Sequence, residues 1–295
     1  TRWDARCDKR LHKLMCYVDS TVDYKMVGWI GDDPSQLTAH LFCDADFAGC
    51  PYTLKSTSGC HTDIEGPNSR FPWGAGSQQQ TSRAHSTPEA ELASLDTGMK
   101  SRGEPALTIW SILLEQYHKD DPLWRFVIHV HEDNTTAIVG ARSGKNPTMK
   151  TLERNHGVSV GWIHERITGG DYNLIHTRGH NMTADMYTKG FINPDLWMRL
   201  RKLINLYAPG ELDRGEVNPP VLDSKGQRID PNPDQSTIKD DGVAMLAGEP
   251  NSLSSDSHSP GIAAPPGELI GINTQYVEIM SGESTFTDLR KPVKV

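Results

Sequence analysis

Short apolar runs alternate with longer amphipathic stretches along residues 37–206, and this alternation restricts the fold more than any other feature of the chain. Three strand-length runs come first, and two more follow, each preceded by helical segments. The five runs are residues 37–43, 59–64, 70–73, 126–130 and 172–176. Strands joined by short turns pair antiparallel, whereas strands separated by helices pair parallel. We therefore expect an α/β domain with a five-stranded mixed sheet flanked by helices.

Helical periodicity and capping residues mark the segments between these strands. Ser86 or Thr87 is placed to cap a helix that has Pro88 in its first turn. The other predicted helices are residues 105–118, 134–144, 152–167, a segment that contains ADMYTK, and 196–206. A further helix at 3–18 and a strand at 24–30 precede the domain. We expect residues 1–34 to be a connection from an upstream unit and residues 35–207 to be the main domain.

The composition changes after Pro209. From Gly210 onward the chain has 14 acidic and 7 basic residues, which leaves residues 1–209 near neutrality although the whole chain has a net charge of −8. The same segment is rich in proline, serine and glycine and contains two aromatic residues, Tyr276 and Phe286. Such a composition buries too little apolar surface to offset the entropy of the chain. We predict a disordered acidic tail at 208–295.

Five cysteines all lie within the first 60 residues, and none forms a CxxC pair. This pattern favours reduced thiols in a cytoplasmic or nuclear setting over a disulfide framework or a zinc site. The sequence has neither a signal peptide nor an apolar run that could span a bilayer, so we expect no membrane partner.

Four acids occupy comparable places in the predicted fold. Asp44 and Asp133 follow strands, and Glu91 and Asp185 lie early in helices. In open α/β sheets, residues at the carboxyl ends of strands converge although they are distant in sequence. Converging carboxylates repel one another unless cations neutralise them, and hard oxygen ligands suit Mg²⁺ or Mn²⁺. Two such ions can support hydrolysis of a phosphate ester.

Neighbouring acids leave this assignment open at three positions. Asp46 shares a strand face with Asp44, so it could support the site or could be a turn residue. Glu89 competes with Glu91, because helical residues two apart point about 200° apart and only one can face the site. Glu132 points away from Asp133 in an extended segment and reads as structural.

Several motifs, in order, resemble the ribonuclease H domain of copia-type LTR retrotransposon Pol polyproteins. They are CDADFAG (Cys43–Gly49), KSTSG (Lys55–Gly59), STPEAELASL (Ser86–Leu95), HEDNTTAI (His131–Ile138), WIHERI (Trp162–Ile167) and ADMYTKG (Ala184–Gly190), together with Gln80. The resemblance covers about residues 8–207 and implies a ribonuclease H-like fold. Departures from the family pattern include Pro88, Glu132 and the segment 156–162, and none removes a proposed ligand.

The resemblance implies a metal-dependent endonuclease that hydrolyses the RNA strand of RNA–DNA hybrids with two Mg²⁺ ions, which Mn²⁺ can replace. It assigns Asp44, Glu91, Asp133 and Asp185 as the metal-binding catalytic acids. It also implies a partner, the reverse transcriptase domain of the same polyprotein, and a location in cytoplasmic virus-like particles and the nucleus. The chain lacks a YxDD-type polymerase motif, so we expect no DNA synthesis.

Four further residues are candidates for roles beside the metal ligands. His180 lies in a loop before Asp185, and an imidazole there could assist proton transfer, although an ordinary loop histidine fits equally well. Gly49, Ser58 and Asn134 are candidates for contacts with the hybrid.

Two other functions remain to be distinguished. Integrases, which share the nuclease fold, are disfavoured because their last acid is a helical glutamate, whereas here it is Asp185. A decayed, non-catalytic nucleic-acid-binding or scaffold module is the main alternative, and it would bind no divalent ions.

Overall fold

A computed structural model describes residues 3–211 except 116, 118–123, 146–148, 150–151 and 192, and beyond them only two short strands, β8 (Val221–Leu222) and β9 (Arg228–Ile229). The predicted disordered tail falls mainly outside the described residues. None of the described helices is both long and apolar enough to cross a membrane. The five cysteines are all free thiols.

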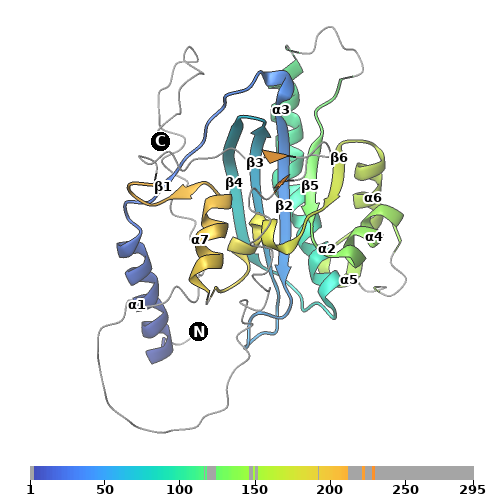
Figure 1. The fold of residues 1–295 in the computed structure, drawn as a ribbon. Helices are drawn as coiled ribbons and strands as arrows, with labels where there is room; N and C mark the ends of the chain where they lie inside the picture. Colours follow the sequence, from blue (N-terminus) through green and yellow to red (C-terminus); the bar gives the residue numbers. More distant parts are fainter. Residues whose placement is uncertain are drawn as a thin grey trace.

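The core of the structure is a five-stranded sheet in the order β4-β3-β2-β5-β6 (Figure 1). Three strands form an antiparallel meander, and two run parallel to β2. The strands are β2 (Thr38–Asp46), β3 (Thr57–Gly66), β4 (Ser69–Gln79), β5 (Ile128–Glu132) and β6 (Tyr172–His176). The predicted α/β class with a five-stranded mixed sheet flanked by helices is therefore confirmed. The strands of the meander are longer than their apolar runs, because their pairing continues into polar residues.

The helices differ from the predicted ones in where they are interrupted. Two predicted helices form one continuous path, since α2 (Thr87–Gly98) leads through a π-helical turn (Met99–Gly103) into α3 (Glu104–Glu115). The segment predicted as one helix at 152–167 is instead split into α5 (Leu152–His156) and α6 (Val160–Thr168). Gly157 between them has φ +68°, a left-handed conformation that ends the first helix.

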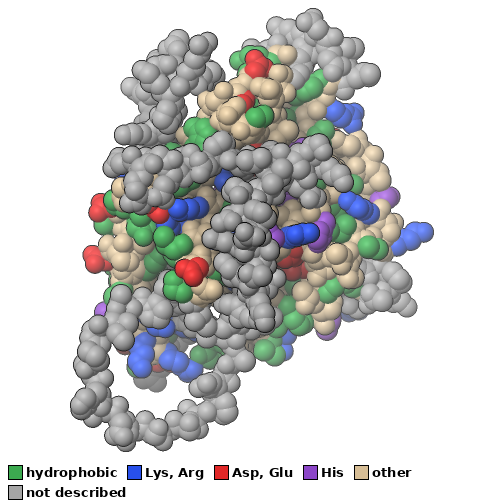
Figure 2. Space-filling model, in the orientation of Figure 1, with side chains coloured by type: hydrophobic (Ala, Val, Ile, Leu, Met, Phe, Trp, Pro, Cys, Tyr) green, Lys and Arg blue, Asp and Glu red, His purple; other side chains and the backbone are tan. Residues whose placement is uncertain are grey.

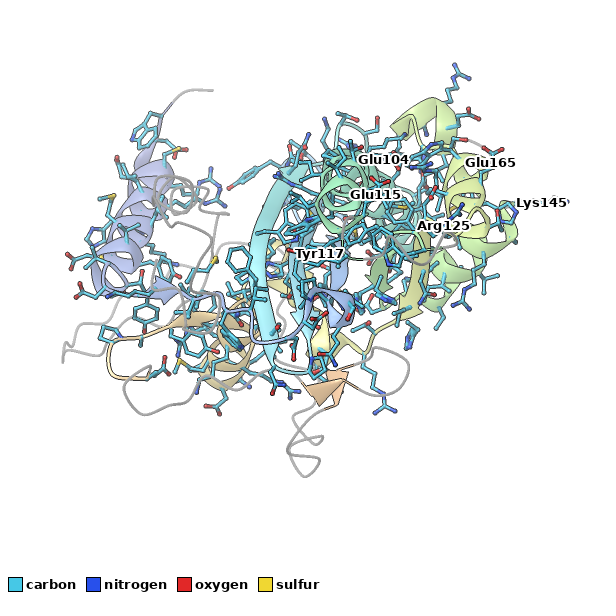
Figure 3. All side chains as sticks on the ribbon, turned by 90° about the horizontal axis from the view of Figure 1, so that it is seen from above. Glu104, Glu115, Tyr117, Arg125, Lys145 and Glu165 are labelled. Carbon is cyan, nitrogen blue, oxygen red and sulfur yellow. The ribbon has the colours of Figure 1, made fainter. Side chains whose placement is uncertain are left out.

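Helices cover one face of the sheet and form the main core. Inward residues of β2 such as Leu41 and Cys43 pack with Leu92 and Leu95 of α2. The same cluster includes residues of α4 (Thr135–Ser143) and α6. At the start of α3, Glu104 (labelled in Figure 3) accepts a hydrogen bond from Arg166 of α6. Arg166 Nε lies 3.0 Å from Glu104 Oε1. This face fixes α2 against β2, the strand that contains Asp44.

The other face of the sheet is covered by the segment that follows β6. This segment contains two 3₁₀ helices, η3 (Gly179–Asn181) and η4 (Thr183–Tyr187), and then α7 (Pro194–Leu203). Phe42 of β2 packs under it with Met182 and Ala184. The sequence predicted an α-helix around ADMYTK, but its residues form the short helix η4. The tighter turn places Asp185 directly over the sheet.

An N-terminal strap, residues 3–31, lies beside this second face (Figure 1). It contains α1 (Ala5–Ser20), which Asp4 caps, and β1 (Lys25–Met26), which is shorter than the predicted strand. β1 pairs antiparallel with β7 (Leu206–Tyr207). The strap is thus joined to the chain segment that follows α7.

Candidate active site

Asp44 and Asp133 lie at the same edge of the sheet. Asp44 is close to the end of β2, and Asp133 directly follows β5, the parallel neighbour of β2. Parallel strands have their carboxyl ends at one edge, so the two acids converge as predicted. Asp44 is 1% exposed, which makes it an unusually buried carboxylate.

Glu91 reaches this edge from α2. Ser86 caps the helix by accepting from the Glu89 amide, and the Ser94 hydroxyl donates to the Asp44 carbonyl oxygen at 2.6 Å. These contacts hold α2 against β2. Ligand atoms of Asp44, Glu91 and Asp133 all lie within 4.8 Å of one another, and no other such group occurs among the described residues.

Asp185 approaches the site from η4 but is connected to it through a lysine. Lys189 Nζ lies 2.8 Å from Asp185 Oδ1 and 3.3 Å from Asp44 Oδ1. The Thr188 hydroxyl donates to Asp44 Oδ2. Gly59, the register partner of Asp44, permits this close approach, because a Cβ there would lie 2.5 Å from Thr188 Cγ2.

Burial and mutual repulsion shape the electrostatics of the acids. Burial raises the pKa of Glu91 well above its usual value, and the charges of Asp44, Glu132 and Asp133 raise it further. Burial followed by the charge of Asp44 likewise raises the pKa values of Asp133 and Asp185. The Lys189 ammonium opposes these shifts in all three acids. One ammonium therefore compensates only part of the negative charge.

The residues present fit a divalent cation. Glu91 is 3% exposed, and its Oε2 has no hydrogen-bond partner. A buried carboxylate oxygen without a partner is costly, and a metal ion would satisfy it. The donors of Asp44, Glu91 and Asp133 are all carboxylate oxygens, the ligands that Mg²⁺ and Mn²⁺ prefer.

The neighbouring acids are engaged elsewhere. Glu89 accepts from the His85 amide at 2.9 Å and lies 3.4 Å from His156 Nε2, so its carboxylate supports the start of α2. Asp46 accepts from the Thr57 amide and secures the loop after β2; its pKa is raised to about 6, mainly by burial. These contacts agree with Glu91 as the helix acid of the group and give Asp46 a structural role.

Glu132 is a further buried carboxylate at this edge. It is fully buried, and its Oε1 accepts from the Asn134 amide at 3.0 Å. Burial, then the charges of Asp133 and Asp44, raises its pKa well above the usual value. The sequence predicted a structural residue that points away from Asp133, but it gave no sign that the charge of Glu132 acts on Glu91.

The other predicted site residues are placed as follows. His180 lies half-buried in η3 and is not part of the acidic group. Asn134 caps α4, and its Oδ1 accepts from the amides of Thr136 and Ala137. The Ser58 hydroxyl accepts from Gln80 Nε2 at 3.0 Å. Gly49 packs so closely on Asp46 that a Cβ would lie 1.7 Å from its Oδ2. Their roles toward a substrate stay predictions.

A polar cavity lies beside α2, close to Ser58. It has a volume of about 130 Å³ and is lined by Ser58, Gln78, Gln79, Gln80, Thr81, Ala93, Thr97 and His156. Gln80 Oε1 is buried there without a hydrogen-bond partner. The cavity offers amide and hydroxyl groups rather than charge.

Sequence reasoning missed Lys189. Its position four residues after Asp185 in ADMYTKG was the available signal, because residues four apart face one another across a helical turn.

The described residues thus define an α/β domain with a carboxylate cluster at the carboxyl edge of a mixed sheet. No family model matches the chain. No curated protein matches it. Among solved structures, it is similar to ribonuclease H1 from the halophilic archaeon Halobacterium salinarum NRC-1, with 12% identity, a TM-score of 0.34 and coverage of 51% of this chain and 94% of that one. It is also similar to LC11-RNase H1, isolated from compost by a metagenomic approach, with 11% identity, a TM-score of 0.33 and coverage of 51% and 92%. Similarity at this level says nothing about what this chain binds or hydrolyses.

Proposed function

We propose that the chain is a metal-dependent endonuclease that hydrolyses the RNA strand of RNA–DNA hybrids. The observation that carries the proposal is the meeting of Asp44, Glu91 and Asp133 within 4.8 Å, with a buried oxygen of Glu91 that has no partner. The motif resemblance in the sequence supplies the substrate class.

The residues of the site have separate tasks in this mechanism. Asp44, Glu91 and Asp133 would hold the divalent cation. Asp185 would add a fourth carboxylate beside them. A divalent cation bound there would activate a water and would stabilise the attacking and leaving oxygens of an in-line displacement. Water oxygen adds to phosphorus, the P–O3′ bond breaks, and the products are a 3′-hydroxyl and a 5′-phosphate. His180 would exchange a proton through a ring nitrogen.

Recognition of the hybrid would depend on neutral polar groups. Residues 1–209 are close to neutral overall, and Lys and Arg side chains occur at separate places on the visible surface in Figure 2. The polar cavity beside α2 could contact a sugar-phosphate backbone without bulk positive charge. Because Ser58 accepts from Gln80, its own hydroxyl proton can be donated to a ribose 2′-oxygen. Gly49 and Asn134 are proposed to contact the same sugar-phosphate backbone.

The wider setting is also a proposal. The motifs of the copia-type ribonuclease H domain suggest a place after the reverse transcriptase in a retrotransposon polyprotein, with residues 1–34 as the connection and 208–295 as the acidic tail. In that setting the protein would act in cytoplasmic particles and in the nucleus, on hybrids left by DNA synthesis.

The full chain with Mg²⁺ should cut the RNA of a labelled RNA–DNA hybrid. Asp133→Asn should reduce cleavage more than about 100-fold, because a carboxylate that holds the cation is lost. Asp96→Asn is the matched control, since Asp96 is a buried acid of α2 that pairs with Lys100 away from the site. Unchanged cleavage by Asp133→Asn would contradict the assignment.

A non-catalytic binding module is the second candidate, and Lys189 favours it. Its ammonium already neutralises part of the cluster, which is what a site without a metal requires. Metal binding separates the two candidates, since the nuclease needs divalent ions and the module does not.

A further inference from the structure

Lys189 is held inside the acidic site by the backbone. Its amide donates to the Asp185 carbonyl oxygen at 3.0 Å, so the chain turns once after η4 and returns toward Asp185. The side chain is 21% exposed, and its Nζ lies between Asp185 and Asp44 at 2.8 and 3.3 Å. An ammonium at this distance from two carboxylates has the position of a bound cation.

The lysine uses the same atoms that a cation between Asp44 and Asp185 would need. Asp44 Oδ1 faces Lys189 Nζ, and Asp44 Oδ2 accepts from Thr188. Asp185 Oδ1 accepts from Lys189. A divalent ion there would displace the ammonium from both oxygens or would be repelled by it at short range. On the other side of Asp44, the group of Asp44, Glu91 and Asp133 retains a buried carboxylate oxygen, Glu91 Oε2, that has no hydrogen-bond partner.

We propose that Lys189 is a built-in cation that occupies the Asp44–Asp185 half of the site, so that the free protein takes up one divalent ion and not two. The ion binds between Asp44, Glu91 and Asp133. Lys189 acts as a positioning residue that holds Asp44 and Asp185 together until an anionic phosphate draws the ammonium away. This inference rests on the proposed metal-dependent function and specifies how that site is loaded.

Calorimetric titration of the full-length protein with Mn²⁺ in the absence of nucleic acid tests this inference. The native protein should bind one equivalent. Lys189→Met should bind two equivalents, or bind the first at least about tenfold more tightly, because a neighbouring positive charge has been removed. Lys189→Arg keeps the charge and should behave like the native protein.

Lys100→Met is the matched control. Lys100 is also four residues after its partner, with Nζ 2.8 Å from Asp96 Oδ2, but it lies outside the cluster. This variant should bind one equivalent of Mn²⁺ with native affinity. If Lys189→Met destabilises the fold, Lys189→Gln retains hydrogen bonds to the carboxylates without the charge. Its unfolding temperature should then rise more on addition of Mn²⁺ than that of the native protein.

The outcomes separate this inference from the proposed function. Identical Mn²⁺ stoichiometry and affinity in the native protein and both neutral variants would overturn the role of Lys189 and leave the metal site standing. Binding by Lys189→Met but not by the native protein would overturn both the native nuclease activity and the one-ion loading, because the ammonium would then exclude the ion from the whole site. An absence of Mn²⁺ binding in every variant would overturn both.

Discussion

Glu91 and Glu89 show at the scale of single residues how a helix separates two similar side chains. The two acids are both buried, but one faces the other carboxylates and the other faces the loop before α2. Their separation of about 200° around the helix axis accounts for this. Glu91 is therefore a candidate metal ligand, whereas Glu89, two positions earlier, stabilises the start of the helix.

Substitution of these two residues should have opposite consequences. Glu91→Gln should abolish Mn²⁺ binding and reduce cleavage more than about 100-fold while the fold is retained. Glu89→Gln should retain Mn²⁺ binding but lower the free energy of unfolding by roughly 1–3 kcal/mol, because the charge-assisted contacts with His85 and His156 weaken. Calorimetry and urea denaturation measure the two effects. Loss of Mn²⁺ binding in Glu89→Gln alone would reverse the assignment.

The sequence could predict some of these residues for physical reasons. Asp44 lies near the end of one buried strand and Asp133 directly follows its parallel neighbour, and adjacent parallel strands bring such positions together whatever the loops do. Glu91 needed the family motif, because helix periodicity alone does not show which side of α2 faces the sheet edge. Lys189 was missed because its spacing of four from Asp185 does not by itself show that its ammonium also reaches Asp44 on β2.

At the scale of elements, α7 is anchored by one buried ion pair. Arg201 is fully buried, and its guanidinium meets both carboxylate oxygens of Glu211 at 2.7 and 2.8 Å. It also donates to the Leu206 carbonyl oxygen, and it lies over the ring of Tyr24 in the strap. This pair connects the end of α7, β7 and the strap.

Removal of one partner should therefore be costly. Glu211→Gln should lower the free energy of unfolding by about 3–5 kcal/mol, because a buried guanidinium loses its counter-charge. Lys202→Met removes a more exposed partner of the same acid, 3.8 Å away, and should change it by less than about 1 kcal/mol. Urea denaturation of both variants measures the difference. Equal effects would show that burial of the pair is unimportant.

The pH dependence of this pair has a definite sign. The hydrogen bond from Arg201 is the main cause that lowers the pKa of Glu211 from 4.5 to about 2. A depressed acid pKa means that the unfolded chain binds the proton more readily. The contribution of the pair is therefore complete above about pH 4.5 and is lost as the pH falls toward 2. In the Glu211→Gln variant, the free energy of unfolding should therefore lack this part of its decrease between about pH 4.5 and pH 2.

Element boundaries were predicted less well than element types. The break between α5 and α6 follows from the left-handed Gly157, whereas the apolar periodicity continues across it. Between α2 and α3 the outcome is the opposite, because a π-helical turn connects two helices that were predicted as separate, the second of them beginning at residue 105. One boundary thus follows from a single glycine, and the other shows tertiary context overriding local helix signals.

For the whole molecule, stability should depend on pH and divalent ions together. Burial first, and then repulsion among the acids, raises the pKa values of Glu91, Asp133 and Asp185. The folded state then binds these protons more tightly than the unfolded state. Without metal, this contribution lowers stability as the pH rises above the ordinary values of 3.8 and 4.5.

Divalent ions should reverse this loss. Ionised carboxylates bind the metal, so the rise in unfolding temperature caused by Mg²⁺ should grow between pH 5 and pH 8. At an ion concentration of 100 times Kd, the gain is about 2.7 kcal/mol. Thermal scans with Mg²⁺ or with a chelator at both pH values measure it. A gain that is the same at both pH values would argue against binding at these acids.

The general architecture was predictable from the sequence, but the cover of the second face was not. Strand length and order determine the mixed sheet, since period-two runs and turn residues are local signals. Met182 and Ala184, from the segment of η3 and η4, pack with Phe42, and they follow no regular apolar pattern. The position of this segment and that of the strap depend on contacts between distant parts of the chain.

The pairing of β1 with β7 has a consequence for the order in which the molecule folds. Met26 and Leu206 are roughly 180 positions apart, and the Asn205 side chain donates to the Val27 carbonyl oxygen across the same junction. Contacts across so long a loop carry a large entropic cost, whereas only residues 67–68 separate β3 from β4 and residues 47–56 separate β2 from β3. The meander can therefore form early as a folding nucleus. The strap, which has no fully buried residue in α1, joins late and is the first part to detach.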